Sequence, residues 1–389
     1  MEWKEVDICQ LCDSISETYK GNASEVVLIN TSDVLNGKCL NHEYVPNKKL
    51  KGQFKKTFRK GDILYSEIRP ANKRFCFVDF EPKDYIASTK LMVLRAHEDV
   101  NPQYLYQILR SNDTLAQLQI LAESRSGTFP QITYSELSNI KISLPSQKTQ
   151  KNIVSILSSL DCKIELNNKI NADLEEMVQV IFKNWFVDFE PFKDGKFVDS
   201  ELGMIPEGWK VGGLFDIAEI FDKKRKPLSG NVREKMDKIY PYYGATSCMD
   251  YVDDYIFDGI YTLIGEDGSV VKENGLPYMQ YVWGKMWVNN HAHILQGKNG
   301  YSTEMIHALL SITNIKFLVT GAVQAKLSQG NMQKILVAIP PKNVLDEIRP
   351  VIDNLYSKIR INTDENSRLS LLRDTLLPRL MSGKIEVPE

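Results

Sequence analysis

Two stretches decide how this chain is built: IVSILSSLDCKIELNNKINADLEEMVQVIFKNWF at residues 153–186 and IRPVIDNLYSKIRINTDENSRLSLLRDTLLPRLM at residues 348–381. Steps of four and three alternate along the first at positions 153, 157, 160, 164, 167, 171, 174, 178, 181 and 185, and the same positions recur 195 residues later in the second. This heptad spacing is typical of a helix that packs lengthwise against another helix. We therefore predict two long helices, each with a seam facing a partner.

Asparagine interrupts the apolar seam at matched positions, Asn167 and Asn171 in the first helix and Asn362 and Asn366 in the second. A polar residue in a seam costs stability but specifies the register and the partner. The match favours two helices that pack against each other or against one specific foreign helix. Two unrelated amphipathic helices would not place their asparagines equivalently.

The repeat extends outward from the helices, because residues 127–186 align with residues 322–381 without a gap. Each copy opens on Trp-Lys, continues through a mixed pattern and closes on an apolar strand that ends in proline, at 140–145 and 335–340. Alternating runs predict strands at 26–29, 63–65, 75–78 and 260–264, and spacings of three and four predict helices at 102–121 and 303–319. We expect an α+β fold with two α/β domains related by pseudo-twofold symmetry. The expected segments are a first domain at 1–146, a helix at 147–190, a linker at 191–208, a second domain at 209–341, and a helix with its tail at 342–389.

The composition is that of a soluble globular protein, with 389 residues, 43% apolar and 25% charged. No apolar run reaches the roughly 18 to 20 residues of a membrane span, and the first residues, MEWKEVDICQ, lack the features of a signal peptide. We expect a cytoplasmic protein without a membrane partner. The net charge of -2 means that any basic surface must be local.

Cys9 and Cys12 form the single C-x-x-C pair, with no second pair at the spacing of a zinc site. Aligning Trp209 with Trp3 places Phe215 over Cys9 and an alanine over Cys12, so we interpret both cysteines as core side chains.

Motifs of catalysis are missing from the sequence. It contains no phosphate-binding loop, dinucleotide fingerprint, serine-nucleophile elbow, zinc-protease motif or amino-methyltransferase signature. His291 and His293 share one face of a predicted strand, but no third metal ligand is evident. Glu266 and Asp267, in IGEDGS, suggest a turn rather than an acid/base pair. We expect no catalytic residues, metal or cofactor in this chain.

Basic residues concentrate in one stretch of each domain, as phosphate contacts require. Ten lysines and arginines lie between residues 48 and 74, interleaved with Phe54, Phe58 and Tyr65, and DKKRKPLSGNVREK at 222–235 is followed by YPYYGATS. The two stretches differ in sequence while the helices match, which favours a constant scaffold carrying two different readers of DNA. The candidate DNA-binding residues are Lys48, Lys49, Lys51, Lys55, Lys56, Arg59, Arg69, Arg74, Lys223, Lys224, Arg225, Lys226, Tyr242, Tyr243 and Ser247.

The chain resembles the specificity subunits of type I restriction-modification systems. The resemblance rests on ILSSLDCKIELNNKINADLEEMVQVIFKNWFVDFEP (156–191), LGMIPEGWK (202–210), YPYYGATS (240–247), FDGIYTLIGEDGS (257–269) and LLRDTLLPRLMSGKIEV (371–387). It implies two target-recognition domains joined by an antiparallel coiled coil and bound to double-stranded DNA. It also implies two modification subunits that bind S-adenosylmethionine and methylate adenine, and restriction subunits that use ATP and Mg²⁺.

Two alternatives remain at this point. A structural coiled-coil adaptor would carry its basic stretches as solvated surface, and specific DNA binding would exclude it. A self-sufficient modification enzyme would need a cofactor pocket, and binding of S-adenosylmethionine by the chain alone would support it.

Overall fold

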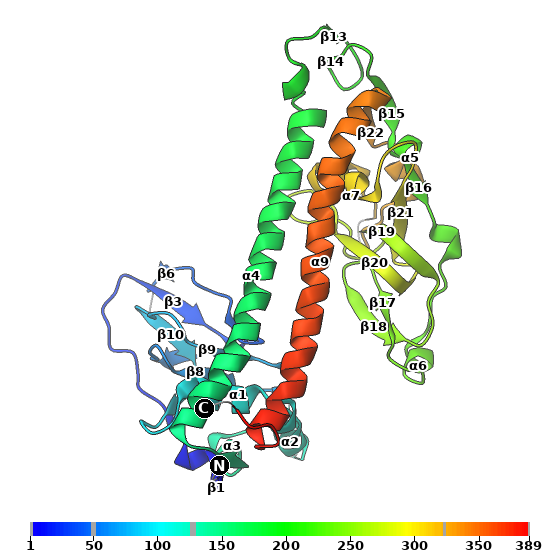
Figure 1. The fold of residues 1–389 in the computed structure, drawn as a ribbon. Coiled ribbons are helices and arrows are strands. Elements are labelled where there is room, and N and C mark those ends of the chain that lie inside the picture. Colours follow the sequence, from blue (N-terminus) through cyan, green and yellow to red (C-terminus); the bar gives the residue numbers. More distant parts are fainter. Residues whose placement is uncertain (1–2, 48–51, 125–129, 322–323, 388–389) are drawn as a thin grey trace. The chain divides into compact units, whose positions relative to one another are not determined.

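The two predicted helices are present as α4 (Gln147–Phe186) and α9 (Lys342–Met381), each 40 residues long (Figure 1). The computed structural model describes residues 3–47, 52–124, 130–321 and 324–387. Every predicted seam position in both helices is buried or half-buried. The heptad pattern therefore identified the buried face of both helices correctly, although α4 ends at Phe186 instead of reaching residue 190.

The chain divides into two compact units, and the division falls in the middle of both helices. Unit 1 comprises Met1–Glu165 with Glu365–Glu389, and unit 2 comprises Leu166–Asp364. Each unit thus contains one of the two expected α+β domains, one half of α4 and one half of α9.

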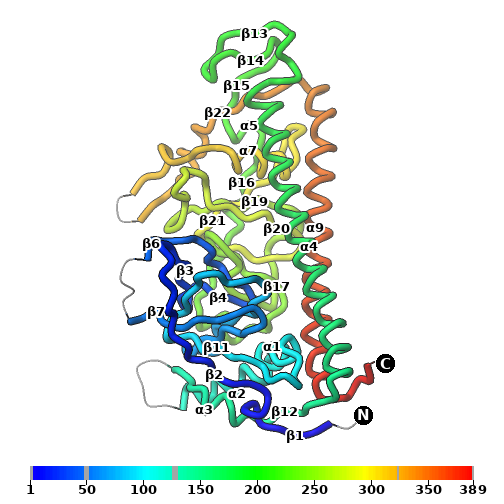
Figure 2. The backbone as a smooth tube through the Cα atoms, turned by 90° about the vertical axis from the view of Figure 1, so that its left-hand side faces the viewer, coloured from blue at the N-terminus to red at the C-terminus, as the bar shows by residue number. Residues whose placement is uncertain are grey.

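Within each unit the two helix halves lie side by side and run antiparallel (Figure 1 and Figure 2). In unit 1, Arg373 Nη1 donates to Asp161 Oδ1 at 2.7 Å, and Lys163 Nζ lies 3.3 Å from Glu365 Oε2. In unit 2, Asn362 Nδ2 donates to Asn171 Oδ1 at 2.8 Å. The helices therefore pair with each other inside each unit, which is one of the two arrangements that the matched seams left open.

The described part of unit 1 holds two four-stranded sheets and two two-stranded ladders. One ladder pairs the predicted closing strand, β12 (Lys141–Leu144), with β1 (Lys4–Asp7) at the start of the domain. The predicted helix at 102–121 is two helices, because Ser111 adopts an extended backbone and its hydroxyl accepts from the amide of Thr114 as an N-cap. The first sheet orders β2 (Cys12–Ile15), β11 (Leu91–Ala96), β8 (Ile63–Ser66) and β9 (Phe75–Phe77); the second orders β6 (Val45–Pro46), β3 (Glu25–Ile29), β10 (Tyr85–Ser88) and β7 (Phe54–Lys56). The remaining elements are β4 (Val34–Leu35), β5 (Lys38–Cys39), α1 (Pro102–Arg110), α2 (Asn112–Glu123) and α3 (Tyr134–Ser138).

Unit 2 repeats the ladder and builds one larger sheet. The ladder is β15 (Lys210–Gly213) with β22 (Leu336–Ile339). The helix predicted at 303–319 ends at Ile312, because Thr313 turns to an extended backbone. The six-stranded sheet orders β16 (Ala218–Ile220), β21 (Ala292–Gly297), β19 (Phe257–Gly265), β20 (Met279–Val288), β17 (Tyr240–Tyr243) and β18 (Cys248–Val252). The other elements are β13 (Phe197–Val198), β14 (Ile205–Pro206), α5 (Leu214–Ile217), α6 (Gly230–Arg233), α7 (Thr303–Ile312) and α8 (Gln329–Met332).

The same four-stranded core underlies both units. The order β2-β11-β8-β9 in unit 1 corresponds to β16-β21-β19-β20 in unit 2, and neighbouring strands in both are antiparallel. Even the register agrees, since Ala96 pairs with Cys12 where Gly297 pairs with Ala218. The chain is therefore one α+β unit built twice, as the sequence predicted.

The core interpretation of the two N-terminal cysteines was half right. Cys12 is fully buried, like Ala218 at the equivalent position. Cys9 is exposed, because the short 3-10 turn at residues 8–10 directs Ile8 into the core and Cys9 outward.

Candidate functional site

The basic stretch of unit 1 places only part of its charge on the surface. Lys55 and Arg59 are exposed. Lys56 is half-buried in β7, where its ammonium donates to the carbonyl of Leu91 at 2.8 Å and burial lowers its pKa. Lys48, Lys49 and Lys51 lie outside the described residues.

The aromatic residues interleaved with this stretch do not form an exposed stacking surface. Phe58 and Tyr65 are 6% and 1% exposed and belong to the core, while Phe54 is half-buried. Phe58 and Tyr65 are therefore unavailable for stacking against bases.

Arg69 and Arg74 flank the turn that follows β8. Arg69 is exposed and has a left-handed backbone, with φ of 45°. Arg74 is half-buried and donates from Nη1 to the carbonyl of Ser32 at 2.9 Å. The turn thus presents Arg69 outward and uses Arg74 as an internal anchor.

The basic run of unit 2 divides in a similar way. Lys223, Lys224 and Lys226 are exposed. The side chain of Arg225, between them, is 12% exposed, and its Nη1 donates to Glu266 Oε2 at 2.6 Å and to the carbonyl of Ala292 at 2.7 Å. Arg225 is therefore committed to partners inside its own unit.

The predicted YPYYGATS segment forms β17 and the turn after it. Tyr242 is 2% exposed; its hydroxyl accepts from the amide of Leu228 at 3.1 Å, and Arg233 lies over its ring. Tyr243 is half-buried, and burial raises its pKa to about 12. Ser247 is exposed at the turn. Of these three residues, Ser247 presents a fully exposed side chain.

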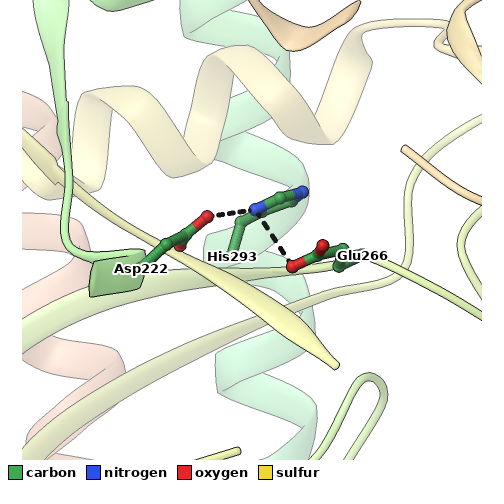
Figure 3. Close-up of side chains that lie close together, drawn as sticks. All are labelled: Asp222, Glu266 and His293. Carbon is green, nitrogen blue, oxygen red and sulfur yellow. Dashed lines mark hydrogen bonds and ion pairs between the residues drawn. The ribbon is translucent and has the colours of Figure 1, made fainter. Parts of the chain in front are cut away.

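A compact cluster of charged groups surrounds His293 in unit 2 (Figure 3). Its Nδ1 lies 2.5 Å from Asp222 Oδ2 and 3.6 Å from Glu266 Oε2, and its Nε2 lies 2.6 Å from the carbonyl oxygen of Leu327. A carboxylate and a carbonyl are both hydrogen-bond acceptors, so each ring nitrogen of His293 faces an acceptor.

A neutral amide and a guanidinium already pair with the carboxylates of this cluster. Gln329 Nε2 donates to Asp222 at 2.7 Å, and Arg225 reaches Asp222 at 3.5 Å as well as Glu266. Burial alone would raise the pKa of Asp222, but the hydrogen bond and charge of His293, with Arg225, hold it below its ordinary value.

The cluster corrects one expectation from the sequence, which showed no third candidate metal ligand beside His291 and His293. His293 does have two further candidate ligands, Asp222 and Glu266, whose ligand atoms lie within 4.8 Å of one another and of the imidazole. Glu266 is accordingly more than a turn residue. A metal ion would have to displace both the imidazole proton and the guanidinium of Arg225, so the geometry fits an internal anchor that holds residues 222–226 against β21.

The seam asparagines lie where the heptad pattern placed them. Asn167 and Asn362 are 0% and 1% exposed, and Asn171 and Asn366 are half-buried. Asn171 Nδ2 also donates to Thr363 Oγ1 at 3.1 Å, which adds a second polar contact beside the bond from Asn362. Their role in setting register remains a prediction.

Among the described residues, no helix combines the length and apolar character that a membrane crossing needs.

Comparison with known proteins gives a consistent result over both units. Residues 2–176 and 206–371 match the family model described as Type I restriction modification DNA specificity domain. The Type I restriction enzyme HindI specificity subunit of Haemophilus influenzae is 31% identical, over 99% of this chain and 100% of that protein. The MjaIX specificity subunit of Methanocaldococcus jannaschii is 26% identical, over 85% of this chain and 79% of that protein.

A solved structure supports the fold. The crystal structure of the type I restriction-modification S subunit from M. genitalium superposes with a TM-score of 0.55 at 17% identity and covers 98% of this chain and 96% of that one.

Proposed function

Because the chain belongs to the family of type I restriction-modification specificity subunits, and its two units are target-recognition domains, we propose that each unit reads one half of a bipartite site in double-stranded DNA. Partner subunits then methylate adenine at that site or cleave the DNA. The observation that carries the proposal is the repeated four-stranded core with different segments built onto it.

Those segments occupy the same place in the chain but fold differently. Between β2 and β8, unit 1 inserts strands that form a second sheet with β10; between β16 and β19, unit 2 inserts α6, β17 and β18, and the strands extend its single sheet. A constant core with different peripheral surfaces suits two readers of different base sequences, because bases are discriminated by the side chains that reach them.

Exposed basic residues supply phosphate contacts in this proposal. They are Lys55, Arg59 and Arg69 in unit 1 and Lys223, Lys224 and Lys226 in unit 2. Arg225 and Tyr242 are left out, because their polar groups are engaged inside unit 2. Binding should weaken steeply with salt, since each neutralised phosphate releases counterions.

Equivalent grooves in the two units support assembly with two copies of one partner, the modification subunit. One groove of about 210 Å³ lies between the end of α4, α7 and β22; the other, of about 200 Å³, lies between the end of α9, α1 and β12. Their walls correspond through the repeat, since Phe186, Leu309 and Val337 of unit 2 stand where Met381, Ile108 and Ile142 of unit 1 stand. Two copies of one subunit need two equivalent binding surfaces, and the two grooves can provide them.

We further propose that this chain acts in the cytoplasm and performs no chemistry of its own. The charges of the cluster at His293 are balanced by contacts inside unit 2. Binding of S-adenosylmethionine, ATP and Mg²⁺ is assigned to the modification and restriction subunits.

Methylome sequencing of the host, with and without this chain, tests the proposal. We expect adenine methylation at a two-part motif only when the chain and its modification subunit are both present. A chain with residues 16–62 replaced by the corresponding segment of a related subunit should change one half of the motif and keep the other. Methylation by the purified chain alone would contradict the non-catalytic role. A motif independent of the chain would favour the structural adaptor.

A further inference from the structure

The most exposed large apolar side chain among the described residues belongs to unit 2. Phe317 is 91% exposed and lies in the 3-10 turn Lys316–Leu318, which follows α7. Water disfavours a bare phenylalanine ring. A single exposed apolar residue is common on protein surfaces, so the meaning of this one depends on how the turn is held and on what surrounds it.

The turn is fixed to the rest of unit 2 on both sides of the phenylalanine. Ile315 is fully buried, and its amide donates to the carbonyl of Gly275 at 3.0 Å. The amide of Leu318 donates to the carbonyl of Ile315 at 2.8 Å, and the carbonyl of Leu318 accepts from Asn331 Nδ2 at 2.7 Å. The ring of Phe317 therefore projects from a held backbone. A side chain that reads another molecule needs such a base, because loose attachment weakens discrimination.

The chain around the turn is basic. Residues 305–345 contain four lysines and no aspartate or glutamate. One of these lysines, Lys326, lies 3.6 Å from Glu266 Oε1 and is therefore already paired with a carboxylate. Lys316 and Lys334 are both exposed. The basic run at residues 222–235 is thus not the only cationic stretch of unit 2.

Lys316 and Lys334 lie close to the exposed ring. Lys316 precedes Phe317 in the chain, and Lys334 Nζ lies 3.2 Å from Oδ1 of Asn331, the residue that holds the turn. The segment at 272–275, which accepts the amide bond of the turn, contains one lysine and one glutamate and so adds no net charge. An exposed ring between two ammonium groups fits a polyanion that also offers apolar surface.

The turn is one of the segments that differ between the two units. In unit 1, α1 is followed after one residue by the 12-residue helix α2, whereas in unit 2 α7 is followed by the 3-10 turn. Figure 2 shows the chain at 318–321 and 324–327, which continues from this turn, on the side of unit 2 away from α9. The helix therefore does not cover this part of the unit.

We propose that Phe317 is a specificity-determining residue of the second recognition domain, whose ring packs against the C5-methyl group of a thymine in the major groove of its half-site. Lys316 and Lys334 contact neighbouring phosphates. That methyl group is the apolar feature of the major groove, where the other base edges present hydrogen-bond donors and acceptors. A phenylalanine side chain neither donates nor accepts, so thymine is the base that it can favour. This inference rests on the proposed function and adds to it one base and the side chain that reads it.

The test uses the full chain assembled with its modification subunit and duplexes that carry the methylated motif. The half-site of unit 2 is the one that stays unchanged when residues 16–62 are exchanged. Each thymine of this half-site is replaced in turn by deoxyuridine, which pairs in the same way but lacks the methyl group. For the unaltered chain, one replacement should weaken binding by roughly 3- to 10-fold.

Phe317→Ala completes a double-mutant cycle with that replacement. The variant should weaken binding to the thymine duplex by a similar factor, and deoxyuridine at the same position should then cause no further loss, because the two changes remove one contact. The melting temperature should stay unchanged, since the side chain is exposed.

Three further variants separate reading of the methyl group from general effects. Phe317→Leu keeps an apolar side chain and should retain part of the methyl dependence. Ile361→Ala removes a side chain of α9 that is 57% exposed and should leave the methyl dependence intact. Lys316→Ala should weaken binding to both duplexes alike and reduce the slope of log affinity against log salt by about one unit.

Additive losses from Phe317→Ala and deoxyuridine would overturn the inference, as would a half-site in which no thymine methyl group affects binding. If Phe317→Ala leaves DNA binding unchanged but weakens assembly with the modification subunit, the ring is a protein contact and the inference fails. A fall of several degrees in melting temperature would overturn it by showing that Phe317 serves the fold. If the unaltered chain directs no two-part methylation, the proposed function itself fails, and that result is distinct from the others.

Discussion

Lengthening both helices tests whether they set the distance between the two half-sites. Three heptads copied from the seams would be inserted between Glu165 and Leu166 in α4 and between Asp364 and Glu365 in α9, where the two units divide. Each insertion adds 21 residues, about 31 Å at about 1.5 Å per residue, and leaves every pairing within each unit in place. About 31 Å corresponds to about nine base pairs of duplex at about 3.4 Å each.

The preferred spacer should therefore lengthen by about nine base pairs, while the bases read in each half-site stay the same. This change is close to one duplex turn of about 34 to 36 Å, so the second half-site returns to nearly the same face of the DNA. Methylome sequencing of cells that carry the lengthened chain and its modification subunit measures the spacer directly.

A single heptad in each helix is the matched control. It adds about 10 Å, or about three base pairs, which turns the second half-site by nearly a third of a duplex turn. Methylation should then fall sharply at every spacer length. If the longer chain keeps the original spacer, or reads different half-site sequences, the helices do not set the distance between the readers.

Three other predictions follow from the contacts in each unit. Asn362→Leu leaves the side-chain oxygen of Asn171 without its donor and should lower the free energy of unfolding by about 1 to 3 kcal/mol. Changing both Asn171 and Asn362 to leucine should recover most of that loss. A double variant that is less stable in urea than the single variant would contradict this. Burial, with a smaller effect of Lys272, lowers the pKa of His307 to about 4. Protonation of His307 in the unfolded chain should therefore lower the free energy of unfolding by up to about 3 kcal/mol as the pH falls from about 6.5 to about 4. In His307→Gln the free energy of unfolding should vary less with pH across that window. Lys55→Ala should reduce the slope of log affinity against log salt by about one unit in filter-binding assays of the assembled complex, and an unchanged slope would remove that residue from the DNA-facing surface.

Local periodicity explains which parts of the fold were predictable. The seam of α4 and α9, the closing strand of each domain and the repeat itself depend on side chains spaced three, four or two residues apart, which one segment displays by itself. Helix ends were less predictable. The break at Ser111 arises because the hydroxyl of Ser111 caps α2, so that α1 does not continue through this residue. The spacing of apolar residues alone does not reveal such a cap.

The candidate site shows the opposite dependence. Lys224 and Arg225 are neighbours in one basic run, yet one is exposed and the other is held by Glu266, 41 residues away. Asp222 and His293 meet across 71 residues. A run of basic residues predicts that phosphate could be contacted. Which of the basic side chains pair with a carboxylate inside the protein depends on the folded backbone, because such pairing depends on distance in space and on burial from water.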